Sequence, residues 1–232
     1  YEKCSAKLDS INPPHDPHGL LVVLLPGLAR TVNSLGGIRR ALIAAGYRVE
    51  TIGYPSTRDD VRVHVERIER TLERMDGSGQ IVFATHSMGG IVARHLLVRN
   101  GAWTKRFSPV GLVMIGTPNN GAHMASLIDE VPIAEFVLGP SLDQLTTEQS
   151  GAVPVPTGLR MCAIAGGLDN ETGCNPLIPG DDDGIVGVDE VFADFVPDRL
   201  LVPQIHSFLM NHPDTIAAVL RFLKGGRCDD DA

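Results

Sequence analysis

The hydrophobic positions of the chain alternate between short continuous apolar runs and longer stretches with helical spacing. Residues 20–25 are apolar throughout, as in a strand buried on both faces of a parallel sheet. In residues 59–75 the apolar positions recur at steps of four and three, while Arg and Glu fill the other face. Such alternation is typical of βαβ units and predicts an α/β protein with a mainly parallel sheet.

We expect about six strands, with helices on both faces of the sheet. The strands are predicted over residues 20–25, 48–54, 80–85, 110–115, 160–165 and 200–202. The helices are predicted over residues 34–46, 59–75, 91–99 and 214–223. No comparable strand pattern occurs within residues 119–158, where we expect a small cap region over an active site.

The length and composition predict one globular domain. The chain has 232 residues and an apolar fraction of 43%, which excludes a disordered or fibrous protein. Residues 1–19 are expected to form an irregular lead-in, residues 20–226 a single domain, and residues 227–232 an acidic tail. The apolar runs are much shorter than the roughly 20 residues that cross a bilayer, so we do not expect an integral membrane protein.

The net charge and the cysteine spacing limit which partners, metals and cofactors we expect. A net charge of −8 argues against nucleic acid as a partner. The four cysteines lack the spacing of zinc or redox sites, and no metal or cofactor is expected. They are either free thiols or form one or two disulfides, for which a bond between Cys4 and Cys228 is one option. The first residue is Tyr1 rather than Met, as after removal of a leader, and the compartment and oligomeric state stay open.

One buried strand pattern runs directly into a helix pattern through Thr85, His86, Ser87, Met88 and Gly89. The stretch matches the nucleophile-elbow motif G-x-S-x-G, except that a threonine replaces the first glycine. Small residues on the helical side let strand and helix backbones approach each other. We therefore predict Ser87 as a nucleophile and the Met88 N–H as an oxyanion donor. A serine that only caps the helix is the alternative.

A second glycine turn follows the first predicted strand, at Pro26, Gly27 and Leu28. A strand, a turn and a helix in this order place a second backbone N–H opposite the elbow, and Leu28 is the predicted donor. The alternative is a plain Pro-Gly turn.

The acid candidates lie after the predicted strand at residues 160–165. They are Asp169 and the consecutive Asp181, Asp182 and Asp183. An acid here would hold a histidine in the tautomer that accepts the serine proton. Position alone leaves these aspartates open as candidates, and Asp169 is a serious one because it comes directly after the predicted strand. At least two of the three consecutive aspartates are expected to belong to a solvated loop or a casual cation site.

Two late histidines are candidates for the base. His206 directly follows the last predicted strand, whereas His212 precedes Pro213 and is expected to cap the final helix or lie at the surface. We therefore predict His206. The other histidines lack metal-ligand spacing, and His64 is expected on the charged face of its helix.

The chain resembles small bacterial-type α/β-hydrolases of the lipase and esterase type, which are serine hydrolases. The likeness spans residues 20–226 and is carried by residues 24–31, 53–57, 85–94, 116–122, 139–140, 144–146, 178–180, 183–186 and 206–211. It implies the α/β-hydrolase fold, a Ser87–Asp183–His206 triad, oxyanion donors at Leu28 and Met88, and no cofactor. The order serine, aspartate, histidine along the chain is also that of this fold. The chain departs from the family at Pro26, where a histidine is usual, but keeps the backbone donor beside it.

The expected reaction is hydrolysis of a carboxylic ester of a small molecule or a lipid through an acyl-enzyme intermediate. One alternative is a thioesterase, amidase or acyltransferase that uses the same triad. The other is a hydrolase-fold protein that binds without catalysis, because a fold alone does not imply activity. The acyl chain and the alcohol do not follow from the sequence.

Overall fold

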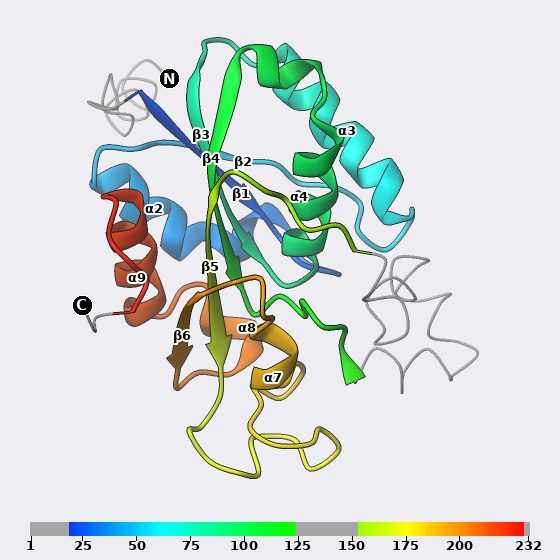
Figure 1. Ribbon diagram of the computed structural model, residues 1–232, viewed down its shortest axis with the longest axis vertical. Helices are drawn as coiled ribbons and strands as arrows, with labels where there is room; N and C mark the ends of the chain where they lie inside the picture. The colour runs from blue at the N-terminus through cyan, green and yellow to red at the C-terminus, as the bar shows by residue number, and fades with distance from the viewer. Residues whose placement is uncertain (1–18, 124–152, 230–232) are drawn as a thin grey trace, which may run out of the picture.

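A computed structural model describes residues 19–123 and 153–229 of the chain (Figure 1). Six strands form one sheet in the order β2-β1-β3-β4-β5-β6, and every neighbouring pair is parallel. They are β1 (Leu20–Leu25), β2 (Arg48–Thr51), β3 (Gly79–His86), β4 (Phe107–Ile115), β5 (Arg160–Gly166) and β6 (Asp198–Val202). The carboxyl ends of all six strands therefore lie along one edge of the sheet, where open α/β proteins bind ligands.

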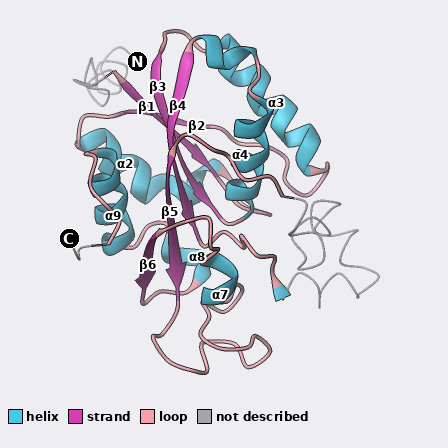
Figure 2. Ribbon diagram, in the orientation of Figure 1, coloured by secondary structure: helices cyan, strands magenta, loops and turns pink. Residues whose placement is uncertain are grey.

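Helices cover both faces of this sheet (Figure 2). One face carries α2 (Gly36–Ala44) and α9 (Pro213–Leu223), and the other carries α3 (Val61–Arg74) and α4 (Met88–Arg99). Each face has its own apolar cluster, because alternate strand residues point to opposite sides of the sheet. The shorter helices are η2 (Val32–Leu35), η3 (Ala102–Lys105), α7 (Val188–Val191) and α8 (His206–Leu209).

The predicted α/β architecture is confirmed, and the differences lie at element ends. The second strand ends at Thr51 rather than at residue 54, because the following residues turn away to contact the loop after β1. The third helix begins at Met88, directly after the strained Ser87, and not at residue 91. The predicted helix at residues 34–46 divides into η2 and α2.

The helix α3 buries one more residue than we expected. Asp60 caps it by accepting a hydrogen bond from the Val63 N–H at 2.9 Å. His64, expected on the charged face, is buried against Tyr54, with ring centroids 4.9 Å apart. Position 64 is three residues after Val61 and therefore lies within the inward stripe, so that expectation was wrong.

The predicted lead-in and most of the predicted cap lie outside the described residues. The two described ends of the cap region meet at Arg94, a buried side chain of α4. Its guanidinium donates hydrogen bonds to the carbonyl oxygens of Asn119, Val153 and Pro154. In the ranges that the structure describes, no helix is long and apolar enough to cross a membrane.

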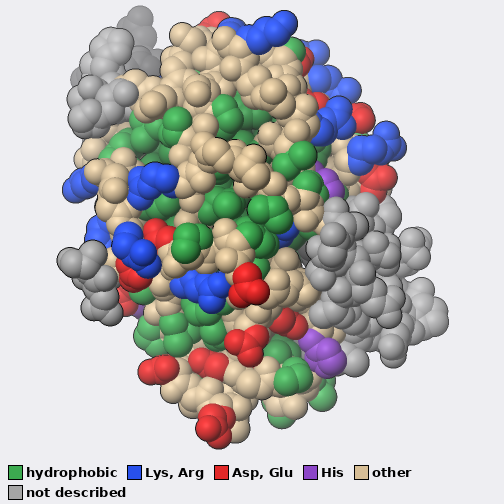
Figure 3. Space-filling view, in the orientation of Figure 1, with side chains coloured by type: hydrophobic (Ala, Val, Ile, Leu, Met, Phe, Trp, Pro, Cys, Tyr) green, Lys and Arg blue, Asp and Glu red, His purple; other side chains and the backbone are tan. Residues whose placement is uncertain are grey.

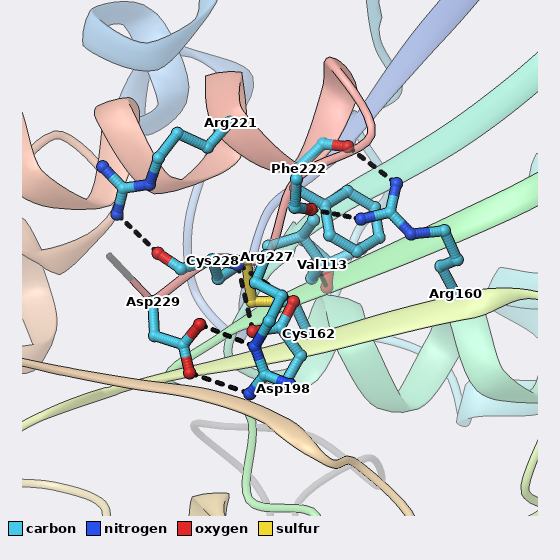
Figure 4. The surroundings of a disulfide bond; sticks show 11 residues. Val113, Arg160, Cys162, Asp198, Arg221, Phe222, Arg227, Cys228 and Asp229 are labelled. Atoms are coloured by element: carbon cyan, nitrogen blue, oxygen red, sulfur yellow. Dashed lines mark hydrogen bonds and ion pairs between the residues drawn. A yellow bond between two sulfur atoms is a disulfide. The ribbon is translucent and has the colours of Figure 1, made fainter. Parts of the chain in front are cut away.

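A disulfide joins Cys162 of β5 to Cys228, which follows α9 (Figure 4). The carboxylate of Asp198, on β6, accepts hydrogen bonds from the Cys228 N–H at 3.0 and 2.9 Å. Cys174 is a free, exposed thiol, and Cys4 lies outside the described residues. Cys228 is thus bonded to Cys162 of the sheet and not to Cys4. This bond attaches the beginning of the expected acidic tail to β5.

Candidate active site

A strained turn joins β3 to α4 at Ser87. The serine has φ 54° and ψ −128°, a backbone conformation that residues with a side chain rarely adopt and that costs about 1–3 kcal/mol. Two hydrogen bonds hold it there. The Ser87 N–H donates to the Ile115 carbonyl at 2.8 Å, and the Thr117 hydroxyl donates to the Ser87 carbonyl at 3.0 Å. The end of β4 therefore fixes the turn in place.

Close backbone packing around the turn explains its glycines. A β-carbon at Gly89 would lie 2.6 Å from the Leu25 carbonyl oxygen, too close for any side chain. A β-carbon at Gly27 would lie 2.7 Å from that of Ser87, so the turn after β1 presses against the serine. Thr85 is accommodated because its side chain is buried and its hydroxyl donates to the Val113 carbonyl at 3.1 Å.

The turn after β1 is fixed by side chains that follow β2. The Tyr54 hydroxyl donates to the Pro26 carbonyl at 2.5 Å, and the Ala29 N–H donates to the Ser56 hydroxyl at 2.9 Å. Within the described residues, no hydrogen bond uses the N–H of Leu28 or that of Met88. These two backbone N–H groups thus have no protein partner among the described residues.

The roles of Tyr54 and Ser56 were not predicted. Their only signal was their place within residues 53–57, one of the stretches that carry the family resemblance. Sequence spacing alone did not connect this stretch with the turn at Pro26.

Asp183 and His206 form a buried pair. The His206 Nδ1 lies 2.7 Å from the Asp183 Oδ2, and both side chains are almost fully buried. The other carboxylate oxygen accepts hydrogen bonds from the N–H groups of Ile185 and Val186 at 3.1 and 2.8 Å. The His206 N–H also donates to the Asp183 carbonyl at 2.9 Å. Backbone and side chain together therefore fix the imidazole relative to the carboxylate.

This pair lies beside the turn at Ser87. The His206 ring is 4.7 Å from the ring of His86, the residue before Ser87. A β-carbon at Gly116 would lie 3.1 Å from both the Cε1 and the Nδ1 of His206. Gly116 directly follows Ile115, the residue that receives the Ser87 N–H. The predicted nucleophile, acid and base thus gather at the carboxyl ends of β3, β5 and β6 (Figure 1).

The neighbouring aspartates organise the loop after β5. Asp181 accepts from the N–H groups of Leu168 and Asp169, both at 2.8 Å. The fully buried Asp182 accepts from the Gly184 N–H at 2.6 Å. The expectation of a solvated loop is therefore wrong for Asp182. Asp169, the competitor, is exposed and has φ 57° in a turn, where its own N–H binds Asp181.

The two candidate bases lie in different surroundings, and His212 is at the helix start where the sequence placed it. His212 caps α9, and its ring accepts a hydrogen bond from the Asp214 N–H at 3.3 Å. Asn211, which follows the helix that carries His206, connects this segment to η2 and α2. Its side-chain amide donates to the Ser34 carbonyl at 2.7 Å and accepts from the Ile38 N–H at 3.0 Å.

Acidic side chains surround part of the site region. In Figure 3 acidic side chains gather at the end of the molecule formed by the loop after β5. Burial raises the pKa of Glu190, whose carboxylate accepts from the N–H groups of Gly187 and His123. Over residues 19–123 and 153–229, one group gathers metal-ligating atoms, namely Cys162, Asp198 and Cys228. Its sulfurs are bonded to each other, so they are not thiolate ligands.

No protein-family model matches the sequence, and no curated protein matches it either. Solved structures do match. A Bacillus licheniformis lipase, BlEst2, has a TM-score of 0.68 and 17% identity, covering 92% of this chain and 96% of its own. A metagenomic carboxyl esterase, MGS0156, has a TM-score of 0.66 and 16% identity, covering 90% and 77%. The NocB thioesterase domain from the nocardicin cluster has a TM-score of 0.54 and 17% identity, covering 89% and 95%.

At these identities the likeness concerns the fold. The three matches cover 92%, 90% and 89% of this chain. Together with the six-stranded parallel sheet and its helices, these matches identify the chain as an α/β-hydrolase fold.

Proposed function

We propose that the protein is a serine hydrolase that cleaves carboxylic esters, with Ser87 as nucleophile, His206 as base and Asp183 as acid. The buried contact of 2.7 Å between Asp183 and His206, next to a strained serine turn, is the observation that carries the proposal. Backbone strain of this kind is found mostly at functional sites, because it costs free energy that a serine with a purely structural role does not require.

The tautomer of His206 fits the role of a general base. A carboxylate only accepts hydrogen bonds, so the Nδ1 of His206 carries the proton that Asp183 receives. The Nε2 of the neutral ring is then the unprotonated nitrogen, and it can accept the proton of Ser87. Asp183 stabilises the imidazolium that results. Because both side chains are buried, this stabilisation is stronger than it would be in water.

The reaction proceeds in two halves. The Ser87 oxygen bonds to the carbonyl carbon of the ester, its proton passes to His206, and the N–H groups of Leu28 and Met88 stabilise the oxyanion. The C–O bond to the alcohol then breaks, and the alcohol leaves with the proton held by His206. Water attacks the acyl-enzyme with the same base, releases the carboxylic acid and restores Ser87.

Steady-state hydrolysis of a short-chain p-nitrophenyl ester tests this proposal. Ser87→Ala should lower kcat by about 10⁴-fold or more, because the acyl-enzyme forms on the Ser87 oxygen. Ser108→Ala is the matched control, because Ser108 is exposed near the opposite end of β4, and it should keep wild-type kcat. An active Ser87→Ala protein would contradict the assignment.

A second assay separates ester hydrolysis from the related reactions. Esters, thioesters and amides that carry the same acyl group are compared, with and without an added alcohol acceptor. Preferential turnover of the ester to free acid supports the proposal. Faster thioester or amide turnover, or transfer to the alcohol, would assign the triad to the alternative reaction, and a lack of turnover of all these substrates would contradict the proposal.

A further inference from the structure

His86, the residue before Ser87, is connected to the proposed base. Its side chain is buried, and its Nε2 lies 3.0 Å from the backbone carbonyl oxygen of His206. A carbonyl oxygen only accepts hydrogen bonds, so the Nε2 of His86 carries the proton and donates it. The last residue of β3 thus holds the first residue of α8 through one hydrogen bond.

The rest of the His86 ring lies between the other parts of the site. The two imidazole rings of His86 and His206 are 4.7 Å apart and inclined by 47°. The Nδ1 of His86 is buried and has no hydrogen-bond partner among the described residues. A β-carbon at Gly27 would lie 3.2 Å from that Nδ1, so the ring also contacts the turn that carries Leu28.

His86 is uncharged in this position. Burial, and then the neighbouring His206, lower its pKa well below the ordinary value of 6.5, and the charge of Arg30 acts in the same direction. The carbonyl of His206 partly offsets these effects. A neutral His86 matters because His206 becomes positively charged during attack, and a second cation 4.7 Å away would oppose that step.

We infer that His86 is a positioning residue that holds His206 in register with Ser87 through its Nε2–H bond to the His206 carbonyl. The inference rests on the proposed function, in which His206 is the base. Asp183 fixes the imidazole ring and one side of the backbone, while His86 fixes the carbonyl on the other side. Without the second hydrogen bond, the first turn of α8 gains freedom to move the base away from the serine.

The variants His86→Leu, His86→Asn and His86→Gln separate hydrogen bonding from shape. Leucine fills a similar volume without a donor, and the asparagine amide is too short to reach the carbonyl. The glutamine amide nitrogen extends about as far from the backbone as the histidine Nε2 and can donate in its place. His95→Leu is the matched control, because His95 is a half-buried histidine of α4 with no described contact to His206.

We expect His86→Leu and His86→Asn to lower kcat by about 10- to 100-fold with little change in KM, since a small misplacement of the base slows the chemical step. His86→Gln should recover most of the loss, and His95→Leu should keep wild-type kcat. Circular dichroism and thermal unfolding check that each variant is folded. If His86→Leu does not fold, the comparison of His86→Asn with His86→Gln decides.

Two outcomes would overturn the inference. Wild-type kcat in His86→Leu or in His86→Asn would show that the base needs no support from position 86. An equal loss in His86→Gln and His86→Asn would show that only the ring shape matters. Failure of the proposed function has a different signature, because a wild-type protein whose Ser87 does not react with a fluorophosphonate would overturn both proposals together.

Discussion

The disulfide between Cys162 and Cys228 should stabilise the fold without contributing to the reaction. The two cysteines are 66 residues apart in the sequence. By the loop-closure model, a cross-link of this length removes unfolded-state entropy worth about 4 kcal/mol. Each kcal/mol changes Tm by about 2–4 °C in a domain of this size, so reduction should lower Tm by about 10 °C.

The activity should survive that change. Cys162 lies about 13 Å before Gly166 along β5, at roughly 3.3 Å per residue. Gly166 is the residue whose β-carbon would contact Asp183, so the sulfurs lie well away from the reacting atoms. The hydrogen bonds from the Cys228 N–H to Asp198 do not involve the sulfur atoms. Ester hydrolysis at 25 °C should therefore be unchanged in the reduced protein.

The assay is thermal unfolding with and without a phosphine reductant, on the wild type, the double variant Cys162→Ala/Cys228→Ala and the single variant Cys174→Ser. Cys174 is free and exposed, so its replacement should leave Tm and its response to the reductant unchanged. The double variant should melt early and no longer respond to the reductant. An identical Tm for oxidised and reduced wild type would refute the reasoning.

Three further predictions concern the site. Asp183→Asn should lower kcat by about 10⁴-fold because the amide favours the wrong histidine tautomer, while Asp169→Asn, at an exposed position, should stay active in the same ester assay. Gly27→Ala should lower kcat by about 10²- to 10³-fold, as after loss of an oxyanion donor, because its β-carbon would meet that of Ser87 at 2.7 Å; wild-type kinetics would contradict this close packing. The free energy of unfolding, measured in urea, should fall as the pH drops below 6.5. His86 should contribute up to about 1.4 kcal/mol per pH unit, because its imidazole is protonated in the unfolded chain but stays neutral when buried in the folded protein. His86→Gln should remove that share of the slope, and an unchanged slope would argue against a buried neutral ring.

The sequence predicted the architecture because each strand carries its own signal. The first strand, residues 20–25, is apolar throughout and buried on both faces, so its boundaries agree with β1. Position 64 shows the limit of such patterns. Histidine is polar enough to be assigned to the solvent face, yet Tyr54 provides a buried ring against which His64 packs. That contact joins residues from different elements and is invisible in local periodicity.

The parts of the site that could be predicted are those fixed by the order of strands and helices along the chain. Ser87 stands between β3 and α4, and His206 follows the end of β6 by a few residues, so topology alone brings them to one edge of the sheet. Among the aspartates, Asp183 was preferred over Asp169 from the family resemblance rather than from physics. The deciding contacts are backbone hydrogen bonds in the loop after β5, and local sequence does not encode which carboxylate they turn inward.

The disulfide illustrates the same limit. Cys162 is an ordinary buried strand residue, and Cys228 comes after the last helix. They meet because α9 packs on the face of the sheet to which the Cys162 side chain points (Figure 2). This packing is a property of the tertiary fold. Pairing by proximity to the chain ends suggested Cys4 instead, because it took no account of this packing.

Covalent labelling of the nucleophile tests the central claim most directly. The protein is incubated with a fluorophosphonate at neutral pH, and the modified residue is located by mass spectrometry of its peptides, beside Ser87→Ala and Ser108→Ala proteins treated in the same way. The account predicts one phosphonate per chain, attached to Ser87, with full labelling of the Ser108→Ala protein and none of the Ser87→Ala protein. Labelling at another serine, or an unlabelled wild-type protein that is folded, would contradict it.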